Sequence, residues 1–600
     1  MWHSISSSMC GIFGFIEKQE GSISNKQELL ENSTNLMIHR GPDDEGYFLD
    51  SVCGLGMRRL SIIDLAPDLY PFISEDGSKH LIFNGEIYNY TQLREELSAK
   101  GYQFKTNCDA EVIIHGFEEW GVDVLQKLSG MFAIAIWDAR RKELFLARDR
   151  IGIKPLYFIN DPKYFFFSSE VKPFLSPNFS YLDKRLDENL VQDLLGFMFL
   201  PHSDKTIIKR VHKLSPGSYM LINKDSLQTK KYWSLGDVKR NTNLSFDNAV
   251  DHLDELLNET VASHLLSDVP VGVLLSGGLD SSLLTAIAAK NKTQGQINTF
   301  TARFDHKFDE SAKARAVAKR LNTNHTELFI DTKGINTNIE DHIHLLDDLS
   351  SFDGGIFSTK LLCEQIRKKG IKVLLLGEGA DEIFGGYSWF GLSQLPFSLL
   401  PSVIRNALYY YAISRNLSVD VFRYLGLWNS LIKDPSDTFS DITRAEVEAQ
   451  LPNHLLMKVD KGTMSSSIEA RVPYLDHKVV EFAYALPRKY KLKGSYFQPS
   501  RSNEKYILRE VAKRYLPNKV AMQKKKGFLL PMKEVLYADI DKVKHYVLAS
   551  NSISSNIFSN NFLESLFSEN TRSIMGMQKE YFLWRIFMLE VWAAENKLSL

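Results

Sequence analysis

The pattern of hydrophobic and polar positions changes along this 600-residue chain at a polar stretch between residues 216 and 245. Before it, in residues 10–215, short apolar segments separated by turn signals predict β-strands. These strands are expected at 81–83, 132–137, 143–147 and 164–168. Helical spacing is found in fewer segments, at 90–100 and 110–120. Many strands with few helices predict sheet layers covered by helices.

After residue 245 the sequence alternates between helical and strand patterns. Helical spacing covers 247–266, 283–290 and 311–321, and apolar strands are expected at 271–275, 299–304 and 373–376. This alternation predicts βαβ units and a parallel sheet. From about residue 390 onward the pattern is mainly helical. We therefore expect an N-terminal extension at 1–9, a first domain at 10–215, a connector at 216–245 and a second domain at 246–600.

Length and composition are typical of a protein with two or three globular domains. Hydrophobic residues make up 44% and charged residues 24%, and the net charge is -1. The composition therefore offers no electrostatic argument for binding nucleic acid or a membrane surface. Four cysteines show neither paired nor metal-ligand spacing, which favours a reduced, cytoplasmic setting.

The longest uncharged run, 383–404, is long enough for a membrane helix. Pro396 and Pro401 interrupt it, so we expect a buried loop and helix start there and no membrane insertion. The oligomeric state stays open at this point, with a homodimer as one option.

Cys10 begins a Cys-Gly-Ile-Phe-Gly segment that predicts a short buried strand. A thiolate is a strong nucleophile. A cysteine at the first position of a mature chain can use its own α-amine as base, since that amine has a pKa of about 7.7–8.0. Residues 1–9 precede Cys10 and lack the features of a signal peptide. Translation from Met9 and methionine removal would expose Cys10; the alternative is an ordinary buried thiol.

A glycine-rich turn, Ser276-Gly277-Gly278-Leu279-Asp280-Ser281-Ser282, follows the strand expected at 271–275. Its glycines let backbone N–H groups approach an anion. Ser281 and Ser282 add hydroxyl groups at a helix N-terminus, which favours phosphate. The lysine of a Walker A loop is missing. The pattern resembles the pyrophosphate loop of ATP pyrophosphatases, which cleave ATP to AMP and pyrophosphate; a plain capped turn is the alternative.

A second polar cluster, Gly377-Glu378-Gly379-Ala380-Asp381-Glu382, follows the strand expected at 373–376. Ligands of an open parallel sheet bind beyond the carboxyl ends of its strands. Three acidic residues at such an end suit Mg²⁺ and a catalytic carboxylate. The alternative is a solvated acidic loop, which the density of glycines disfavours.

These motifs resemble those of the glutamine-dependent asparagine synthetases, which join a class II glutamine amidotransferase to an ATP-pyrophosphatase synthetase domain. The resemblance runs from Cys10 to about Pro531. Its other motifs are His39-Arg40-Gly41-Pro42-Asp43, Arg59-Leu60-Ser61-Ile62-Ile63-Asp64, Phe83-Asn84-Gly85-Glu86-Ile87-Tyr88-Asn89, Arg148-Asp149-Arg150-Ile151-Gly152, residues 467–476 and Lys525-Lys526-Gly527-Phe528. It implies an N-terminal-nucleophile αββα sandwich, then a parallel-sheet α/β domain with a helical C-terminal part.

In the first domain, the resemblance implies that Cys10 attacks the glutamine side-chain amide and forms a thioester. The residues implied for glutamine binding are Arg59, Asn84, Gly85, Glu86 and Asp109. Asn84 and the Gly85 N–H would form the oxyanion hole. Arg59 would pair with the substrate α-carboxylate, and Asp109 would receive the substrate ammonium. Ammonia would then travel through an internal tunnel to the second site.

In the second domain, the resemblance implies that ATP activates a carboxylate as an acyl-adenylate. The residues implied for ATP binding are Leu274, Ser276, Gly277, Gly278, Asp280, Ser281, Ser282 and Gly377. Asp280 and Asp381 would bind Mg²⁺-pyrophosphate. Lys525 would neutralise phosphate charge, and Glu378 would deprotonate the attacking ammonia or its adduct.

Departures from the family pattern lie around the nucleotide and the acceptor. Leu376, Arg303 and Gln523 stand where a serine, a small residue and an arginine are usual, and 347–362 lacks the usual prolines. We expect aspartate as the acceptor, giving asparagine. The alternative is the same chemistry on another carboxylate, such as a uronic acid sugar. The intact Cys10 disfavours a non-catalytic scaffold.

Overall fold

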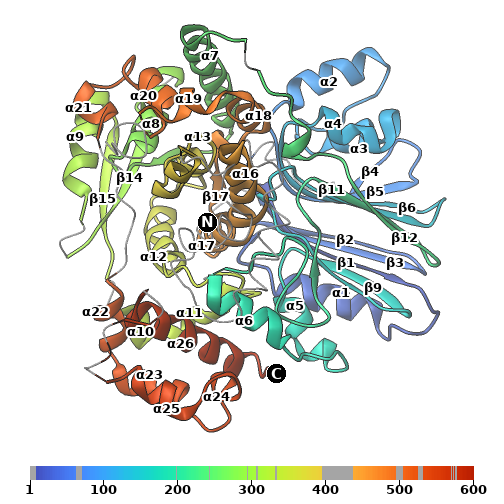
Figure 1. The fold of residues 1–600 in the computed structure, drawn as a ribbon. Coiled ribbons are helices and arrows are strands. Elements are labelled where there is room, and N and C mark those ends of the chain that lie inside the picture. Colours follow the sequence, from blue (N-terminus) through green and yellow to red (C-terminus); the bar gives the residue numbers. More distant parts are fainter. Residues whose placement is uncertain are drawn as a thin grey trace, which may run out of the picture.

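The N-terminal part of the chain is built on two antiparallel sheets and the C-terminal part on a parallel sheet (Figure 1). The computed structural model describes residues 8–62, 71–197, 199–241, 243–292, 295–305, 309–331, 334–394, 437–494, 504–523, 531–568, 571, 573–574 and 577–600. The fold class expected from the sequence is confirmed in these residues.

The first sheet holds the strand that contains Cys10 near its centre. In spatial order its strands are β10 (His212–Lys213), β8 (Tyr157–Asn160), β9 (Tyr164–Ser168), β1 (Ser8–Glu17), β3 (Cys53–Ser61) and β2 (Asp44–Leu49). Each strand runs antiparallel to its neighbours. The register pairs Cys10 with Arg59, so β3 places the arginine motif directly beside the cysteine.

The second sheet contains β12 (Leu227–Lys231), β11 (Ser218–Ile222), β7 (Glu143–Arg148), β6 (Gly130–Asp138), β5 (Lys79–Ile87) and β4 (Phe72–Ile73), in spatial order. Strands β11 and β12 lie in the range 216–245, which was expected to be a connector. That expectation is wrong for the first half of the range, because β11 pairs with β7 and β12 pairs with β11. The sheet therefore continues through Lys231, and the connection to the C-terminal part begins after it.

Strand alternation arranges the two sheets as the middle layers of an αββα sandwich. Cys10, Ile12 and Ile16 of β1 share one buried cluster with Ile82 of β5, so this face of β1 points toward the second sheet. Phe13, on the opposite face, packs in a cluster with residues of α1 (Lys26–Asn35). Helices α2 (Tyr90–Ala99) and α3 (Glu111–Trp120) cover the outer face of the second sheet. The cysteine is thereby held between the two sheets.

The parallel sheet has the spatial order β15 (Asn324–Phe329), β14 (Asn298–Arg303), β13 (Val271–Leu274), β16 (Val373–Leu375) and β17 (Glu469–Arg471). Strands β13, β14 and β16 agree with the sequence-based expectation, whereas β15 and β17 were not expected. On one side of β13 the next strands are β14 and then β15, and on the other side they are β16 and then β17. The strand order therefore reverses between β13 and β16, which makes their carboxyl ends a switch point where open α/β sheets bind ligands.

Helices surround this sheet and continue to the end of the chain. Near the sheet they are α7 (Phe246–His264), α8 (Leu279–Asn291), α9 (Ser311–Leu321), α12 (Gly355–Arg367), α13 (Ala380–Phe384), α16 (Thr438–Ala445), α17 (Leu456–Met464), α18 (His477–Ala485) and α20 (Tyr506–Ala512). The last helices, which lie together in red in Figure 1, are α22 (Met532–Tyr537), α23 (Ile540–Val547), α24 (Ile553–Ile557), α25 (Asn560–Ser565) and α26 (Lys579–Glu595). Among the described residues, no helix combines the length and apolarity needed to cross a bilayer.

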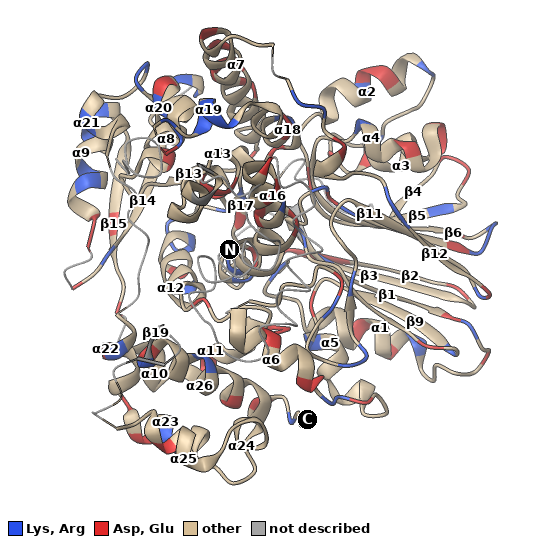
Figure 2. Cartoon of the chain, in the orientation of Figure 1, with Lys and Arg blue, Asp and Glu red and all other residues tan. Residues whose placement is uncertain are grey.

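Charged residues of both signs are interspersed over the helices and sheet ends of both parts (Figure 2). This distribution agrees with the net charge of -1.

Candidate active sites

Cys10 lies buried in β1 with only 4% of its surface exposed. Burial raises the pKa of the Cys10 thiol to about 12; Arg59 works against this shift and Asp109 adds to it. The fold therefore brings together three of the residues predicted for the glutamine site. Since the thiol is protonated at neutral pH, its reaction needs a base.

Asn84 and Gly85 lie on β5, in the sheet that faces Cys10. Asn84 Nδ2 lies 3.5 Å from Ser169 Oγ, which also accepts a hydrogen bond from Ile12 N at 3.1 Å. Ser169 thus ties the predicted oxyanion residue to the strand that carries Cys10. A Cβ at Gly85 would come within 2.0 Å of Met131 O, so only glycine fits the spacing of β5 and β6. Ser169 was not predicted as a site residue, because it belongs to none of the sequence motifs described above.

The two carboxylates predicted to bind the glutamine ammonium differ in their partners. Asp109 Oδ2 accepts a hydrogen bond from Ile87 N at 2.8 Å, and burial raises the pKa of Asp109 to about 6. Glu86 is 1% exposed, and its Oε2 lies 3.1 Å from Arg471 Nη2 on β17. Burial also raises the pKa of Glu86, which Arg471 counteracts. Asp109 is thus held by hydrogen bonds from Ile87 N and Cys108 Sγ, whereas Glu86 pairs with a cation and links the glutamine site to the parallel sheet.

The phosphate-loop motif forms the predicted strand, turn and helix start between β13 and α8. Ser276 Oγ and Ser281 Oγ lie 2.9 Å apart and close the turn. Gly277 has φ +75°, and a Cβ there would lie 2.6 Å from Ala314 N, so the turn needs glycine. Gln523, one of the departures from the family pattern, donates from Nε2 to Gly277 O at 2.5 Å.

The acidic motif after β16 lies directly against this loop. A Cβ at Gly377 would lie 3.2 Å from Ser281 N, so the two loops touch at the switch point. Apart from Gly377, which follows β16, the residues predicted for ATP binding lie in β13, in the turn and in the first turn of α8. The structure therefore brings the predicted ATP residues to one edge of the sheet.

Asp280 and Asp381 come together through a buried lysine. Lys505 Nζ lies 2.7 Å from Asp280 Oδ2 and 2.6 Å from Asp381 Oδ1, and Lys505 is 3% exposed. A Cβ at Gly386 would clash with Asp381 Oδ1 and with Lys505 Cε, so this approach also needs glycine. Sequence reasoning missed Lys505, since a single lysine at a helix start carries no signal.

Asp280 and Asp381, whose carboxylates both contact the ammonium group of Lys505, also suit a Mg²⁺ ion. Carboxylate oxygens are its preferred protein ligands, and it commonly combines one or two of them with phosphate oxygens. No group of three or more metal-ligating side chains occurs in the described part of the chain. Phosphate oxygens and water would therefore have to complete the coordination. Lys525, predicted to neutralise phosphate charge, lies outside the described residues.

A buried ion-pair network joins the two parts of the chain. Arg40, from the first part, contacts Asp460 of α17 through Nη1 at 2.8 Å and Nη2 at 3.0 Å, and contacts Glu170 at 3.1 Å. Lys461 reaches Asp347 at 2.7 Å and Glu170 at 3.8 Å. Because these charged groups are shielded from water, each needs its oppositely charged partners to compensate for the cost of burial.

We expect Arg40→Met to lower the free energy of unfolding by about 3–5 kcal/mol, because it leaves Asp460 and Glu170 as buried charges without a full complement of cations. Urea unfolding followed by circular dichroism measures this change. Arg185→Met, which breaks a surface pair with Asp183, is the matched control and should leave the midpoint unchanged. An equally stable Arg40→Met would show that the network does not hold the two parts together.

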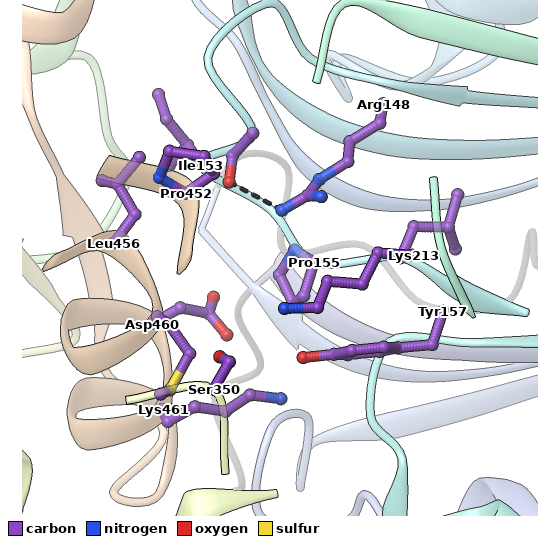
Figure 3. Close-up of a pocket in the computed structure, with 13 residues that line it drawn as sticks. Arg148, Ile153, Pro155, Tyr157, Lys213, Ser350, Pro452, Leu456, Asp460 and Lys461 are labelled. Atoms are coloured by element: carbon purple, nitrogen blue, oxygen red, sulfur yellow. Dashed lines mark hydrogen bonds between the residues drawn. The ribbon is translucent and has the colours of Figure 1, made fainter. Parts of the chain in front are cut away.

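A small pocket lies beside this network, between the two parts of the chain (Figure 3). In Figure 3, Asp460 and Lys461 on one side face Lys213 and Tyr157 on the other. Its lining residues are Arg148, Gly152, Ile153, Pro155, Leu156, Tyr157, Lys213, Ser350, Pro452, Leu456, Met457, Asp460 and Lys461. This lining includes neither Cys10 nor Glu378, so the pocket does not by itself connect the two predicted sites.

Comparison with known sequences extends over both parts of the chain. The sequence model described as glutamine amidotransferase domain matches residues 9–233, and the one described as asparagine synthase matches residues 252–594. Asparagine synthetase [glutamine-hydrolyzing] 1 of Bacillus subtilis (strain 168) is 30% identical, over 98% of this chain and 97% of its own length. Asparagine synthetase [glutamine-hydrolyzing] 3 of the same strain is 30% identical over 87% of each chain. Amidase chyE of Penicillium rubens is 29% identical over 88% of this chain and 89% of its own length.

Proposed function

Because the chain belongs to the asparagine synthase family, we propose that it makes asparagine from aspartate with ATP and with ammonia released from glutamine. The observation that carries this proposal is the pairing of two sites in one chain. Cys10 lies opposite Arg59 between the antiparallel sheets. The loop that begins at Ser276 meets Gly377 at the switch point of the parallel sheet.

In the glutamine site, the Cys10 sulfur attacks the side-chain amide carbon. The carbon–nitrogen bond then breaks, releases ammonia and leaves a thioester, which water hydrolyses to glutamate. Asn84 and the Gly85 N–H stabilise the oxyanion. Arg59 binds the α-carboxylate of glutamine and Asp109 its ammonium, because these two side chains carry the matching charges beside Cys10.

In the synthetase site, an oxygen of the acceptor carboxylate attacks the α-phosphorus of ATP and pyrophosphate leaves. Ammonia then attacks the acyl carbon, a proton passes to Glu378, and AMP leaves. The turn after β13 binds phosphate through its backbone N–H groups and serine hydroxyls. The ammonium group of Lys505 offsets the negative charge of the Asp280 and Asp381 carboxylates. Mg²⁺, when held by these two carboxylates, supplies further neutralisation of the departing pyrophosphate.

The two sites are linked by Arg471, which we propose as a positioning residue. Its guanidinium contacts Glu86 and Glu469 and donates to the carbonyls of His264 and Leu266. Its own carbonyl accepts a hydrogen bond from Leu376 N at 2.9 Å, two residues before Glu378. A shift of Glu86 on glutamine binding would reach, through these contacts, the strand that ends at the synthetase site.

We expect Arg471→Met to uncouple the two reactions, because it cuts the link between Glu86 and β17. The ratio of glutamate to asparagine formed should rise about fivefold or more, the lower range of coupling between sites. Amino-acid analysis of the products measures the ratio. Ammonia-dependent synthesis serves as the folding control, and Arg471→Lys should restore part of the coupling. An unchanged ratio in Arg471→Met contradicts this role.

A panel of acceptors tests the proposed product. With glutamine and ATP present, aspartate should give asparagine, AMP and pyrophosphate, whereas free and nucleotide-linked uronic acids should give no more pyrophosphate than a reaction without acceptor. Turnover of a uronic acid with no aspartate turnover would instead favour the alternative acceptor. That outcome would leave the assignments in the glutamine site unchanged.

A further inference from the structure

Polar side chains from three separate segments gather next to Glu378, and we call this group the Lys458 cluster. Its members are Glu378 after β16, Ser351 and Asp353 before α12, His454 of the helical segment before α17, and Lys458 of α17. Lys458 Nζ lies 3.6 Å from Glu378 Oε1 and 3.6 Å from Asp353 Oδ2. Lys458 and Asp353 carry no role in the glutamine or ATP site described above.

Two members of the cluster, His454 and Lys458, are carried by an irregular helix. Helices α16 and α17 are joined by a π-helical segment, Glu446–Leu455, with Pro452 inside it. Wide turns of this kind are often found at functional sites, because they redirect side chains within a continuous helix. His454, at the end of the segment, lies 2.6 Å from Ser351 Oγ through Nδ1. Burial lowers the pKa of His454 to about 4, so its ring is neutral.

The two carboxylate oxygens of Asp353 have different partners, a backbone N–H for one and Lys458 for the other. Asp353 Oδ1 accepts a hydrogen bond from Gly355 N at 2.8 Å. A Cβ at Gly355 would lie 2.9 Å from that oxygen and 3.3 Å from Lys458 Cδ, so glycine permits the arrangement. Asp353 Oδ2 points toward Lys458 and lies 4.0 Å from His454 Nε2. The hydrogen bond to Oδ1 therefore orients the second oxygen of Asp353 toward Lys458.

The cluster differs from the interdomain ion pairs in being accessible. The side chains of Lys458, Asp353 and Glu378 are 18%, 26% and 31% exposed, whereas those of Arg40 and Asp460 are 0% and 4% exposed. The cluster combines one lysine side chain with two acidic side chains. A molecule with both an ammonium and a carboxylate group complements this set, whereas an acid without an amine leaves a carboxylate unmatched.

We propose that Asp353 and Lys458 bind the ammonium and the α-carboxylate of an amino-acid acceptor and thereby select an amino acid over an amine-free acid. This inference rests on the proposed function, since it takes Glu378 to mark the acceptor side of the synthetase site. Asp353 Oδ2 accepts a hydrogen bond from the acceptor ammonium, and Lys458 Nζ donates to its α-carboxylate. The side-chain carboxylate of the acceptor is then left for attack on ATP.

Asp353→Asn tests the ammonium contact. Pyrophosphate release is measured with ammonia as the nitrogen source, so that the glutamine site is bypassed, and L-aspartate is compared with succinate, which lacks only the amine. Losing the charged contact should raise the KM for aspartate about 10- to 100-fold. The kcat/KM for succinate should not change, so the selectivity for aspartate over succinate falls by the same factor.

Lys458→Met tests the carboxylate contact and should weaken aspartate and succinate together, because both acids carry that carboxylate. Lys368→Met, at an exposed position after α12, is the matched control and should leave both KM values unchanged. Glutaminase activity reports whether each variant has folded. Wild-type KM and selectivity in folded Asp353→Asn would overturn the proposal, as would a wild-type enzyme that prefers succinate to aspartate.

A different result would contradict the proposed function itself: a wild-type protein that forms no AMP with any acceptor. If an amino acid other than aspartate is the acceptor, the proposed product is wrong. In that case the same comparison, made with that amino acid and its deaminated counterpart, still decides whether Asp353 binds the ammonium.

Discussion

Cys10→Ala is expected to abolish glutamine hydrolysis, with a fall on the order of 10⁴-fold or more, as is found when a covalent nucleophile is removed. Alanine has no sulfur with which to form the thioester, so the covalent route to glutamate is lost. Asparagine synthesis from added ammonia should persist, because the synthetase site has its own machinery. Glutamate and asparagine are measured in parallel, with either nitrogen source.

A second comparison concerns the base that activates Cys10. Burial raises the pKa of its thiol to about 12, so a base beside it is needed near pH 7. Strand β1 continues through Met9 to Ser8, so in this chain the Cys10 nitrogen is a peptide amide. A chain that begins at Cys10 offers a free α-amine with a pKa of about 7.7–8.0. We expect full glutaminase activity only from that chain, and mass spectrometry of active protein should show Cys10 as its first residue. Equal activity from a chain that retains Met1 would exclude the α-amine as the base.

Asp280→Asn is expected to eliminate acceptor-dependent formation of pyrophosphate, with a loss of about 100-fold or more, since charge stabilisation at a transferring phosphoryl group contributes several kcal/mol. Asparagine keeps the shape of the side chain but removes the charge that faces Lys505 and, in our proposal, Mg²⁺. Pyrophosphate and AMP are measured with aspartate, ATP and ammonia.

Glutaminase activity is the internal control for Asp280→Asn, because Asp280 lies at the parallel sheet and not between the antiparallel sheets. Asp225→Asn, at an exposed turn between β11 and β12, is the matched charge control and should retain both activities. Formation of ADP and phosphate by the wild-type protein, in place of AMP and pyrophosphate, would contradict the assignment of the loop.

The sequence was sufficient for those parts of the protein that depend on local patterns. Short apolar segments predicted β1 and β6, and helical spacing predicted α7 and α9, because the side-chain pattern of a segment follows from its backbone geometry. Glycine-rich turns after two strands predicted both loops of the synthetase site. The resemblance to a known family covered nearly the whole chain, and with it the overall fold class.

Elements with weak local signals were not predictable in the same way. Strand β17 has three residues, and β12 is almost entirely exposed and polar. Both become strands because a neighbouring strand offers backbone hydrogen bonds, β16 in one case and β11 in the other. Tertiary context overrides weak propensity at such positions.

The chemistry of single residues was thus determined by the sequence, and their partnerships by the tertiary structure. Cysteine at position 10 and the carboxylates at 280, 378 and 381 were predicted as candidate reactive groups from residue type and motif. That Lys505 joins Asp280 to Asp381, that Arg471 reaches Glu86, and that Lys458 lies between Glu378 and Asp353 depends on residues about 80 to 390 positions apart. Such contacts leave no periodic trace in the chain, because they arise only when sheets and helices pack and bring distant charges within a few ångströms of one another.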